Sequence, residues 1–154
     1  MKNADKHLLL KYLKSQKLMT LATYSDKPWV ATVYYIADDD LNLYFLTSPK
    51  TEHGQHIAKN GHVACNIADT SQKVTDKKTG VQIQGIASRV NAVQKMICLF
   101  RMWHKINPGT EERLNFQNIK NKVISARVHK VTPTRIKFFN EKLYPSEEFK
   151  VFYL

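Results

Sequence analysis

The segment Leu41–Ile57, LNLYFLTSPKTEHGQHI, passes directly from a strand pattern to a helix pattern. Apolar and polar side chains alternate up to Thr47, which is typical of a half-buried strand, and Ser48-Pro49-Lys50 then breaks the pattern. Thr51 follows at the position where a helix N-cap residue is expected. The sequence therefore predicts a strand, a tight corner and a short helix in immediate succession.

Three features that favour phosphate binding meet at this corner. A helix start presents unpaired backbone N–H groups, neighbouring hydroxyls can donate hydrogen bonds, and a lysine supplies a point positive charge. The side chains concerned are Thr47, Ser48, Lys50 and Thr51. The plainer alternative is that Thr51 only caps a helix and Lys50 is a solvated surface lysine, because such corners are common.

Hydrophobic periodicity predicts a series of short strands with a few helices inserted. The expected strands are Leu18–Tyr24, Trp29–Ala37, Leu41–Thr47, His62–Ala68, Val81–Val90, Val123–Lys130, Arg135–Asn140 and Phe149–Tyr153. The expected helices are Asp5–Gln16, Thr51–Asn60, Ala92–Asn107 and Thr110–Lys120. Six or seven of these strands, paired antiparallel in a chain of 154 residues, favour a closed or split barrel, because a barrel hides its sheet edges.

Turn residues add local predictions. The acidic turn Asp38–Asp40 joins two strands as a hairpin. Gly61 is expected at the C′ position of the short helix, and Gly85 within a strand indicates a bulge or a close backbone approach. Asn107-Pro108-Gly109 is expected to end the longest helix.

The run PWVATVYYIADDDLNLYFLTSPKTEHGQHI, residues 28–57, resembles the core of the FMN-binding split-barrel superfamily, which includes pyridoxamine 5′-phosphate oxidase. The resemblance extends over Leu18–Tyr24, His62–Asp69, Val81–Val90 and Arg127–Asn140, and so covers most of the chain. It implies a mainly β fold, a six- to seven-stranded antiparallel split β-barrel like that of pyridoxamine 5′-phosphate oxidase, as a single FMN-binding domain over residues 1–154.

The resemblance also implies FMN as cofactor, held between the two copies of a homodimer, and oxidoreductase activity on an unknown small molecule. A small barrel fills its interior with side chains, which likewise favours a ligand site in a groove formed with a second copy. The residues expected at the phosphate are Thr47, Ser48, Lys50 and Thr51, with His53 auxiliary. Those expected along the flavin ring are Ala31, Thr32 and Val33, with Gln82 and Gln84 as further polar contacts.

The helix start departs from the oxidases of this superfamily. Lys50-Thr51-Glu52-His53 resembles a small group of bacterial split-barrel proteins with Lys-Thr-x-His, and Glu52 and His53 replace the paired cations of the oxidases. Glu52 suits the helix dipole but repels a phosphate, so Lys50 and protonated His53 would have to compensate. This favours an alternative function, a non-catalytic split barrel that has lost flavin and carries or senses haem or another anionic ligand. Nothing after Arg135 reproduces the C-terminal Trp and Arg that the oxidases use on their substrate, so that substrate is not carried over.

The net charge of +11 requires a nucleic-acid alternative to be weighed. Lysines are scattered through every segment, and the densest group, in QKVTDKKTG, matches an exposed hairpin loop. No zinc-finger spacing or recognition-helix pattern accompanies it, so we expect no nucleic-acid partner and interpret the charge as solvated surface that attracts anionic ligands.

The remaining features predict a cytoplasmic protein without a metal. The start MKNADKHLLLKYLKSQ is broken by lysines and is neither a signal peptide nor a spanning helix. Cys65 and Cys98 are expected as reduced, packed thiols. His53 and His56 share one helix face, but no carboxylate or thiolate completes a metal site. Four aromatic residues could form either an interface or core: Trp29, Tyr34, Tyr35 and Trp103.

Overall fold

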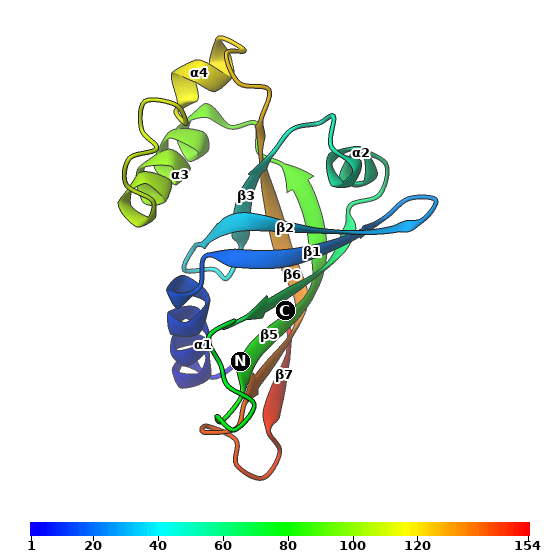
Figure 1. The fold of residues 1–154 in the computed structure, drawn as a ribbon, viewed down its shortest axis with the longest axis vertical. Coiled ribbons are helices and arrows are strands. Elements are labelled where there is room, and N and C mark those ends of the chain that lie inside the picture. Colours follow the sequence, from blue (N-terminus) through cyan, green and yellow to red (C-terminus); the bar gives the residue numbers. More distant parts are fainter.

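The computed structural model describes residues 1–154, which form seven strands and four helices (Figure 1). The strands are β1 Leu18–Tyr24, β2 Pro28–Ala37, β3 Leu43–Thr47, β4 His62–Ala68, β5 Thr79–Arg89, β6 Arg127–Asn140 and β7 Phe149–Tyr153. The helices are α1 Asn3–Ser15, α2 Glu52–Lys59, α3 Val93–Ile106 and α4 Phe116–Lys120.

Six of the strands close into an antiparallel barrel. The sheet runs in the order β3-β2-β1-β4-β5-β6-β7, and a further pairing between β3 and β6 completes the barrel. β7 lies outside the closure, because it pairs only with β6. The predicted mainly β split barrel is therefore confirmed.

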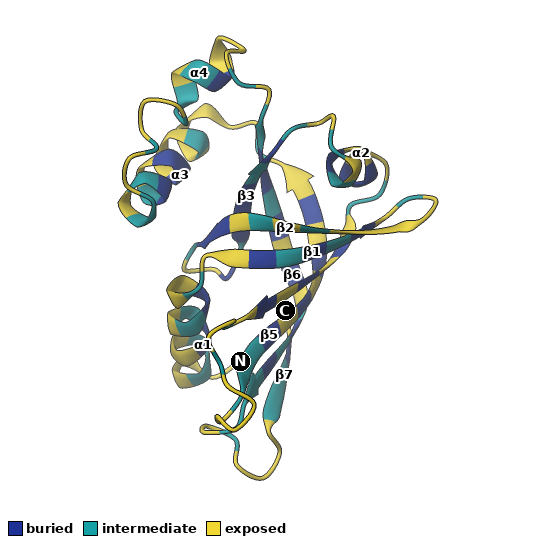
Figure 2. Cartoon of the chain, viewed as in Figure 1, coloured by how far each residue is buried: buried dark blue, intermediate teal, exposed yellow.

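The barrel interior is an apolar core that α1 covers at one end (Figure 2). Leu9 and Leu13 of α1 are fully buried against the inner faces of the strands. The hydroxyl of Tyr35 donates a hydrogen bond of 2.6 Å to the backbone oxygen of Leu13 and so ties the helix to β2. Burying each leucine stabilises the fold by about 2 kcal/mol.

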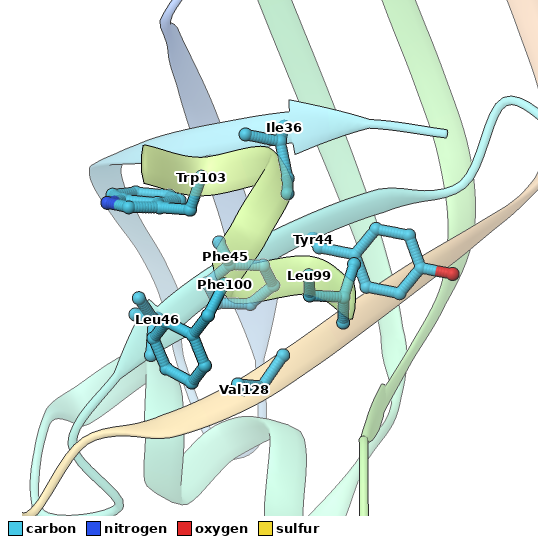
Figure 3. Close-up of a pocket in the computed structure, with 8 residues that line it drawn as sticks. All are labelled: Ile36, Tyr44, Phe45, Leu46, Leu99, Phe100, Trp103 and Val128. Carbon is cyan, nitrogen blue, oxygen red and sulfur yellow. The ribbon is translucent and has the colours of Figure 1, made fainter. Parts of the chain in front are cut away.

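A second, smaller core lies on the outer side of β3 and β6, beneath α3 and α4. Figure 3 shows the α3 side chains pointing toward the sheet, with a small apolar crevice between helix and strands. Its buried residues are Ile36, Tyr44, Leu99, Phe100, Trp103, Ile119 and Val128. The segment between β5 and β6 is thus anchored to the outside of the barrel mainly by apolar contacts, with an ion pair of 3.6 Å between Lys95 and Asp38 at the edge. The indole N–H of Trp103 has no hydrogen-bond partner there.

Several predicted elements differ from the structure in extent. The two strands expected at Val123–Lys130 and Arg135–Asn140 form one strand, β6, because a register shift at Gln84/Gly85 of β5 accommodates Pro133. A Cβ on Gly85 would lie 2.6 Å from the Thr132 oxygen, so the predicted close approach at this glycine is confirmed. The helix expected from Thr110 begins only at Phe116, with Asn115 as its N-cap.

Two further local predictions hold only in part. Leu41 was expected inside a strand, but it adopts a left-handed conformation with φ 67°, and β3 begins at Leu43. Gly61 does follow the C-cap Asn60 and so occupies the predicted C′ position, but it does not have the positive φ that is usual there. It lies against β5 instead, where a Cβ would come within 2.8 Å of the Ala87 oxygen.

Burial corrects part of the expectation for aromatic and thiol side chains. Tyr35 and Trp103 are buried in the two cores, whereas Trp29 and Tyr34 are exposed on β2. Both cysteines are free thiols, but only Cys65 is buried, and Cys98 lies on the exposed face of α3. None of the helices is long and apolar enough to cross a membrane.

The barrel is split along β2, and this opening positions the candidate site. Residues 35–37 of β2 pair with β3, whereas residues 28–34 pair only with β1. The chain leaves β3 at Thr47, turns through the corner and enters α2, which packs against β1 and β2 (Figure 1). The open edge of β2 therefore faces the region between the end of β3 and α2.

Candidate functional site

The corner between β3 and α2 is a tightly hydrogen-bonded turn. Thr51 caps α2 as predicted, since its Oγ1 accepts a hydrogen bond of 3.2 Å from the Gly54 N–H. The same hydroxyl donates to the backbone oxygen of Ser48 at 2.8 Å. Ser48 Oγ in turn accepts from the N–H of Lys50 at 3.3 Å. A Cβ on Gly54 would lie 2.5 Å from the Ser48 oxygen, so only glycine allows the first turn of α2 to approach the corner this closely.

His53 turns into the corner and contacts both threonines. Its Nε2 lies 2.5 Å from Thr47 Oγ1 and 3.3 Å from Thr51 Oγ1, and the two hydroxyls are 3.0 Å apart. Burial, and to a lesser extent the neighbouring His56, lowers the pKa of His53. His53 therefore serves here as a neutral hydrogen-bonding partner, which disfavours the positive charge that the sequence-based hypothesis required of it.

Glu52 forms a contact that directs its carboxylate away from the corner hydroxyls. Its Oε1 lies 3.2 Å from Nε2 of His56, and Nδ1 of His56 lies 3.2 Å from Thr23 Oγ1 on β1. His56 and Thr23 are buried, whereas the Glu52 side chain is about half exposed. This chain of contacts fastens α2 to the barrel and gives Glu52 a structural role besides its effect on the helix dipole.

Lys50 is the free cation of the corner. It is exposed, and no carboxylate lies within salt-bridge distance of its ammonium group, since the four ion pairs of the chain involve other residues. Only its backbone is engaged, because the Gln55 side chain donates to the Lys50 carbonyl at 3.1 Å. Its charge is therefore available to an anionic ligand.

The start of β6 forms a third side of the corner that sequence reasoning missed. Arg127 lies directly opposite Thr47 in the β3–β6 ladder. Ser125 Oγ lies 3.3 Å from Ser48 Oγ, and the Arg127 guanidinium donates to the carbonyls of Ser125 and Ala126 at 3.0 and 2.9 Å. These residues are far from the corner in sequence, and only the pairing of β3 with β6 brings them together.

His129 lies deeper on the same face of β6 and is buried. Its ring stacks on Phe45 with centroids 5.4 Å apart, and its Nδ1 lies 3.2 Å from the Arg127 carbonyl. Burial is the main cause that lowers the pKa of His129, and the charges of Arg89 and His53 lower it further, against the raising effect of the Arg127 carbonyl. Arg89 pairs with His129 in the β5–β6 ladder, so both side chains belong to the same face.

The residues expected along the flavin ring lie on the open part of β2. The N–H of Tyr35 donates to the Lys17 oxygen at 3.0 Å. In an antiparallel pair every second residue bonds to the partner strand, so Val33 and Ala31 also bond to β1 through their backbone groups. The N–H and C=O of Thr32 consequently point to the open edge. The Thr32 side chain is exposed, and those of Ala31 and Val33 are half-buried toward the core.

Gln82 and Gln84 lie away from the corner of their own chain. Both are exposed on the outer face of β5. The register places Thr32, Thr20, Asn66 and Gln82 in one row across four strands, so Thr32 and Gln82 are about 14 Å apart at the usual strand spacing. Within one chain, Gln82 and Gln84 therefore lie too far from the open edge of β2 to contact a flavin ring placed there.

The outer face between these residues is shallow and carries small side chains. Two adjoining hollows extend over β1, β4 and β5, with Ala22, Ala64 and Gln84 common to both. The neighbouring exposed apolar side chains are Leu18, Val30, Tyr34 and Ile86. A flat surface of small and apolar side chains suits contact with another protein surface.

The sequence and fold can be compared with known proteins. The model of the pyridoxamine 5′-phosphate oxidase family matches residues 6–140. A UPF0306 protein of Photorhabdus laumondii is 28% identical to this chain over 96 residues. The matched region covers 61% of this chain and 66% of that protein, which is just under two-thirds of its length. One of Yersinia pseudotuberculosis is 27% identical over 128 residues, 78% of this chain and 86% of that protein.

A solved structure, described as a heme-binding protein from Mycobacterium smegmatis, superposes with a TM-score of 0.76 at 14% identity. The superposition covers 99% of this chain and 59% of that one. At this level of identity the likeness concerns the fold alone.

Proposed function

Because this chain belongs to the pyridoxamine 5′-phosphate oxidase family, we propose that it binds FMN as a homodimer and acts as a flavin-dependent oxidoreductase on a small molecule. The observation that carries the proposal is the corner between β3 and α2, where the unpaired charge of Lys50 adjoins three hydroxyl groups and the N-terminus of α2 beside the open edge of β2. The donor set fits a phosphate monoester, since it combines one mobile cation with preorganised dipoles.

The chain's own residues would divide the work of holding the cofactor. Thr47, Ser48, Lys50 and Thr51 would hold the phosphate. The ring would lie along the open edge of β2, where the backbone N–H and C=O of Thr32 are free to bond to its polar edge. FMN, when bound, supplies the electron-transfer chemistry, and the protein supplies orientation and exclusion of water.

A second copy of the chain would complete the site. Gln82 and Gln84 are too far from Thr32 in one chain to contact the same ring. They lie on the shallow outer face that adjoins β2, so a two-fold contact through this face would bring one protomer's glutamines toward its partner's open edge. This supports the homodimer as part of the proposal.

The second candidate is a non-catalytic ligand-binding barrel. Glu52 in the first turn of α2 favours it, because a carboxylate there repels a phosphate. The structural likeness to a protein described as heme-binding also favours haem as the ligand of such a module. Nε2 of His53 is engaged by two threonines, so haem ligation by that nitrogen would require it to change partners, whereas His129 is engaged by a carbonyl through Nδ1 alone.

The two candidates are separated by titrating ligand-free protein with FMN, riboflavin and haemin. We expect FMN to bind at least about ten-fold more tightly than riboflavin, because only FMN presents a phosphate to the corner. Equal affinity for FMN and riboflavin would refute the corner as a phosphate site. Tight binding of haemin with no binding of either flavin would establish the second candidate.

A further inference from the structure

The first turn of α2 lacks the cations that a phosphate dianion needs. It carries Glu52, which is negative, and His53, which is buried enough to favour its neutral form. Lys50 supplies a single charge against the two of the phosphate. If the corner binds a phosphate monoester, further positive charge has to come from another part of the chain.

Cationic side chains face the corner from β5 and β6. Arg127 lies opposite Thr47, and Arg89 lies opposite His129 one step deeper on the same face. Neither arginine forms an ion pair with any carboxylate of the chain. Arg127 is half-buried and keeps one guanidinium nitrogen on the carbonyls of Ser125 and Ala126, which leaves the other edge of the fork without a partner.

A mostly buried histidine with one free ring nitrogen lies at the same place. Only 6% of the His129 surface is exposed to solvent. Of its two ring nitrogens, only Nδ1 forms a hydrogen bond within the chain. Nε2 has no hydrogen-bond partner. The buried side-chain atoms without a partner are Trp103 Nε1 and Tyr144 Oη, so Nε2 of His129 is in contact with solvent. It therefore faces the opening rather than the closed core. This nitrogen is free toward the opening beside two arginines that have no carboxylate partner. An anion bound there would meet two guanidinium groups and, once the imidazole is protonated, a third N–H donor.

We propose that Arg127 and Arg89 form the second half of an anion site and bind the phosphate together with Lys50, replacing the cations that α2 lacks, with the free ring nitrogen of His129 as a further hydrogen-bonding partner. Arg127 acts as the principal cation, because Ser125 beside it already contacts Ser48 of the corner. A guanidinium fork matches two phosphate oxygens, whereas Lys50 contributes a point charge. The assignment rests on the proposed function for the identity of the ligand, but the anion site itself does not.

The test compares Arg127→Gln, Arg127→Lys and the matched control Arg101→Gln, whose side chain is exposed on α3 and which lowers the net charge by the same amount. FMN and riboflavin affinities are measured by calorimetry for each variant. We expect Arg127→Gln to weaken FMN roughly ten- to hundred-fold, Arg127→Lys to weaken it less, and Arg101→Gln to change it by less than about two-fold. Riboflavin should bind all variants equally.

Inorganic phosphate provides a second arm that does not depend on flavin. The imidazole signals of His129 and His53 are followed by NMR while phosphate is added, and we expect phosphate to raise the pH at which His129 titrates in the unchanged protein but not in Arg127→Gln. If FMN fails to bind but this shift is seen, the anion site stands and the FMN function fails. If FMN binds and Arg127→Gln leaves its affinity unchanged, or weakens riboflavin equally, the arginine site is refuted while the FMN function stands. Absence of both effects refutes both.

Discussion

Replacing Lys50 by alanine isolates the charge contribution of the corner. The Lys50 ammonium has no ion-pair partner and its side chain is exposed, so its removal breaks no contact within the folded chain. We therefore expect the free energy of unfolding to change by less than about 0.5 kcal/mol. Any loss of FMN affinity can then be assigned to the ligand contact.

The magnitude follows from the contact that Lys50 would make. A hydrogen bond to a charged group contributes roughly 1.5–3 kcal/mol, which corresponds to about ten- to hundred-fold in affinity. Because Lys50 is exposed, salt screens its charge, and we expect the lower end of this range, about ten-fold, at physiological ionic strength. The loss should become larger as the salt concentration is reduced.

The reciprocal change acts on Glu52. Glu52→Arg places a cation in the first turn of α2 and should tighten FMN by about one order of magnitude. It also removes the contact with His56, so Glu52→Gln, which keeps an oxygen for that histidine, is the gentler variant and should tighten FMN less. The two variants together separate the charge effect from the loss of the α2 anchor.

Calorimetry with FMN and riboflavin measures both changes. Lys59→Ala, which removes an exposed lysine at the other end of the same helix, is the matched control and should leave both affinities unchanged. FMN affinity that is insensitive to Lys50→Ala, or a loss that riboflavin shares, would show that the corner is only a helix cap. Equal losses in Lys50→Ala and Lys59→Ala would mean that general surface charge, rather than a site, attracts FMN.

Three further predictions follow from the geometry. Gly54→Ala should destabilise the protein by about 1–3 kcal/mol in urea unfolding, because its Cβ would lie 2.5 Å from the Ser48 oxygen, whereas Gly80→Ala, with its nearest atom at 3.5 Å, should have little effect; equal effects would contradict the tight corner. Burial lowers the pKa of His129 from its ordinary 6.5, so the unfolded chain takes up the proton first and the free energy of unfolding should fall as the pH drops through 6.5 and below. If stability falls equally steeply in His129→Gln, this residue is not the source of the effect. Light scattering should give twice the chain mass of 17.8 kDa, and the dimer interface should exceed roughly 2,000 Å² in total. Ala64→Arg on the outer face should produce monomers that lose FMN, and a monomeric unchanged protein would refute the two-copy site.

Local signals explain which parts of the corner could be predicted from sequence. Pro49 ends a strand pattern and Thr51 has the side chain that caps a helix, and both effects act over a few residues. The acidic turn is equally local, since the Asp38 carboxylate accepts from the backbone N–H groups of Asp40 and Asn42. Such features do not depend on the rest of the fold.

The missing parts of the site depend on contacts between distant segments. Arg127 and His129 join the corner only because β3 pairs with β6 to close the barrel, and no pattern within either strand specifies that partner. The inward turn of His53 likewise depends on where the Thr47 hydroxyl lies after closure. Gln82 lies in a strand as predicted, but its distance from Thr32 follows from the strand order and register.

The boundaries of β6 and α4 failed for a different reason. Pro133 falls in the gap between the two predicted strands, whereas the bulge opposite it at Gly85 lets the ladder continue. The segment from Thr110 has a helical composition, but its chain turns irregularly until Asn115 supplies a cap. In both cases a tertiary contact or a single cap overrides the propensity of the surrounding residues.

The visible absorption spectrum of the purified, unmodified protein tests the central claim most directly. We predict the absorption bands of a bound flavin, which increase when FMN is added and excess ligand is removed, in a ratio of one FMN per chain. A Soret band in place of flavin bands would assign the barrel to haem. A colourless protein that retains no FMN after reconstitution would contradict the proposal that this chain is a flavoprotein.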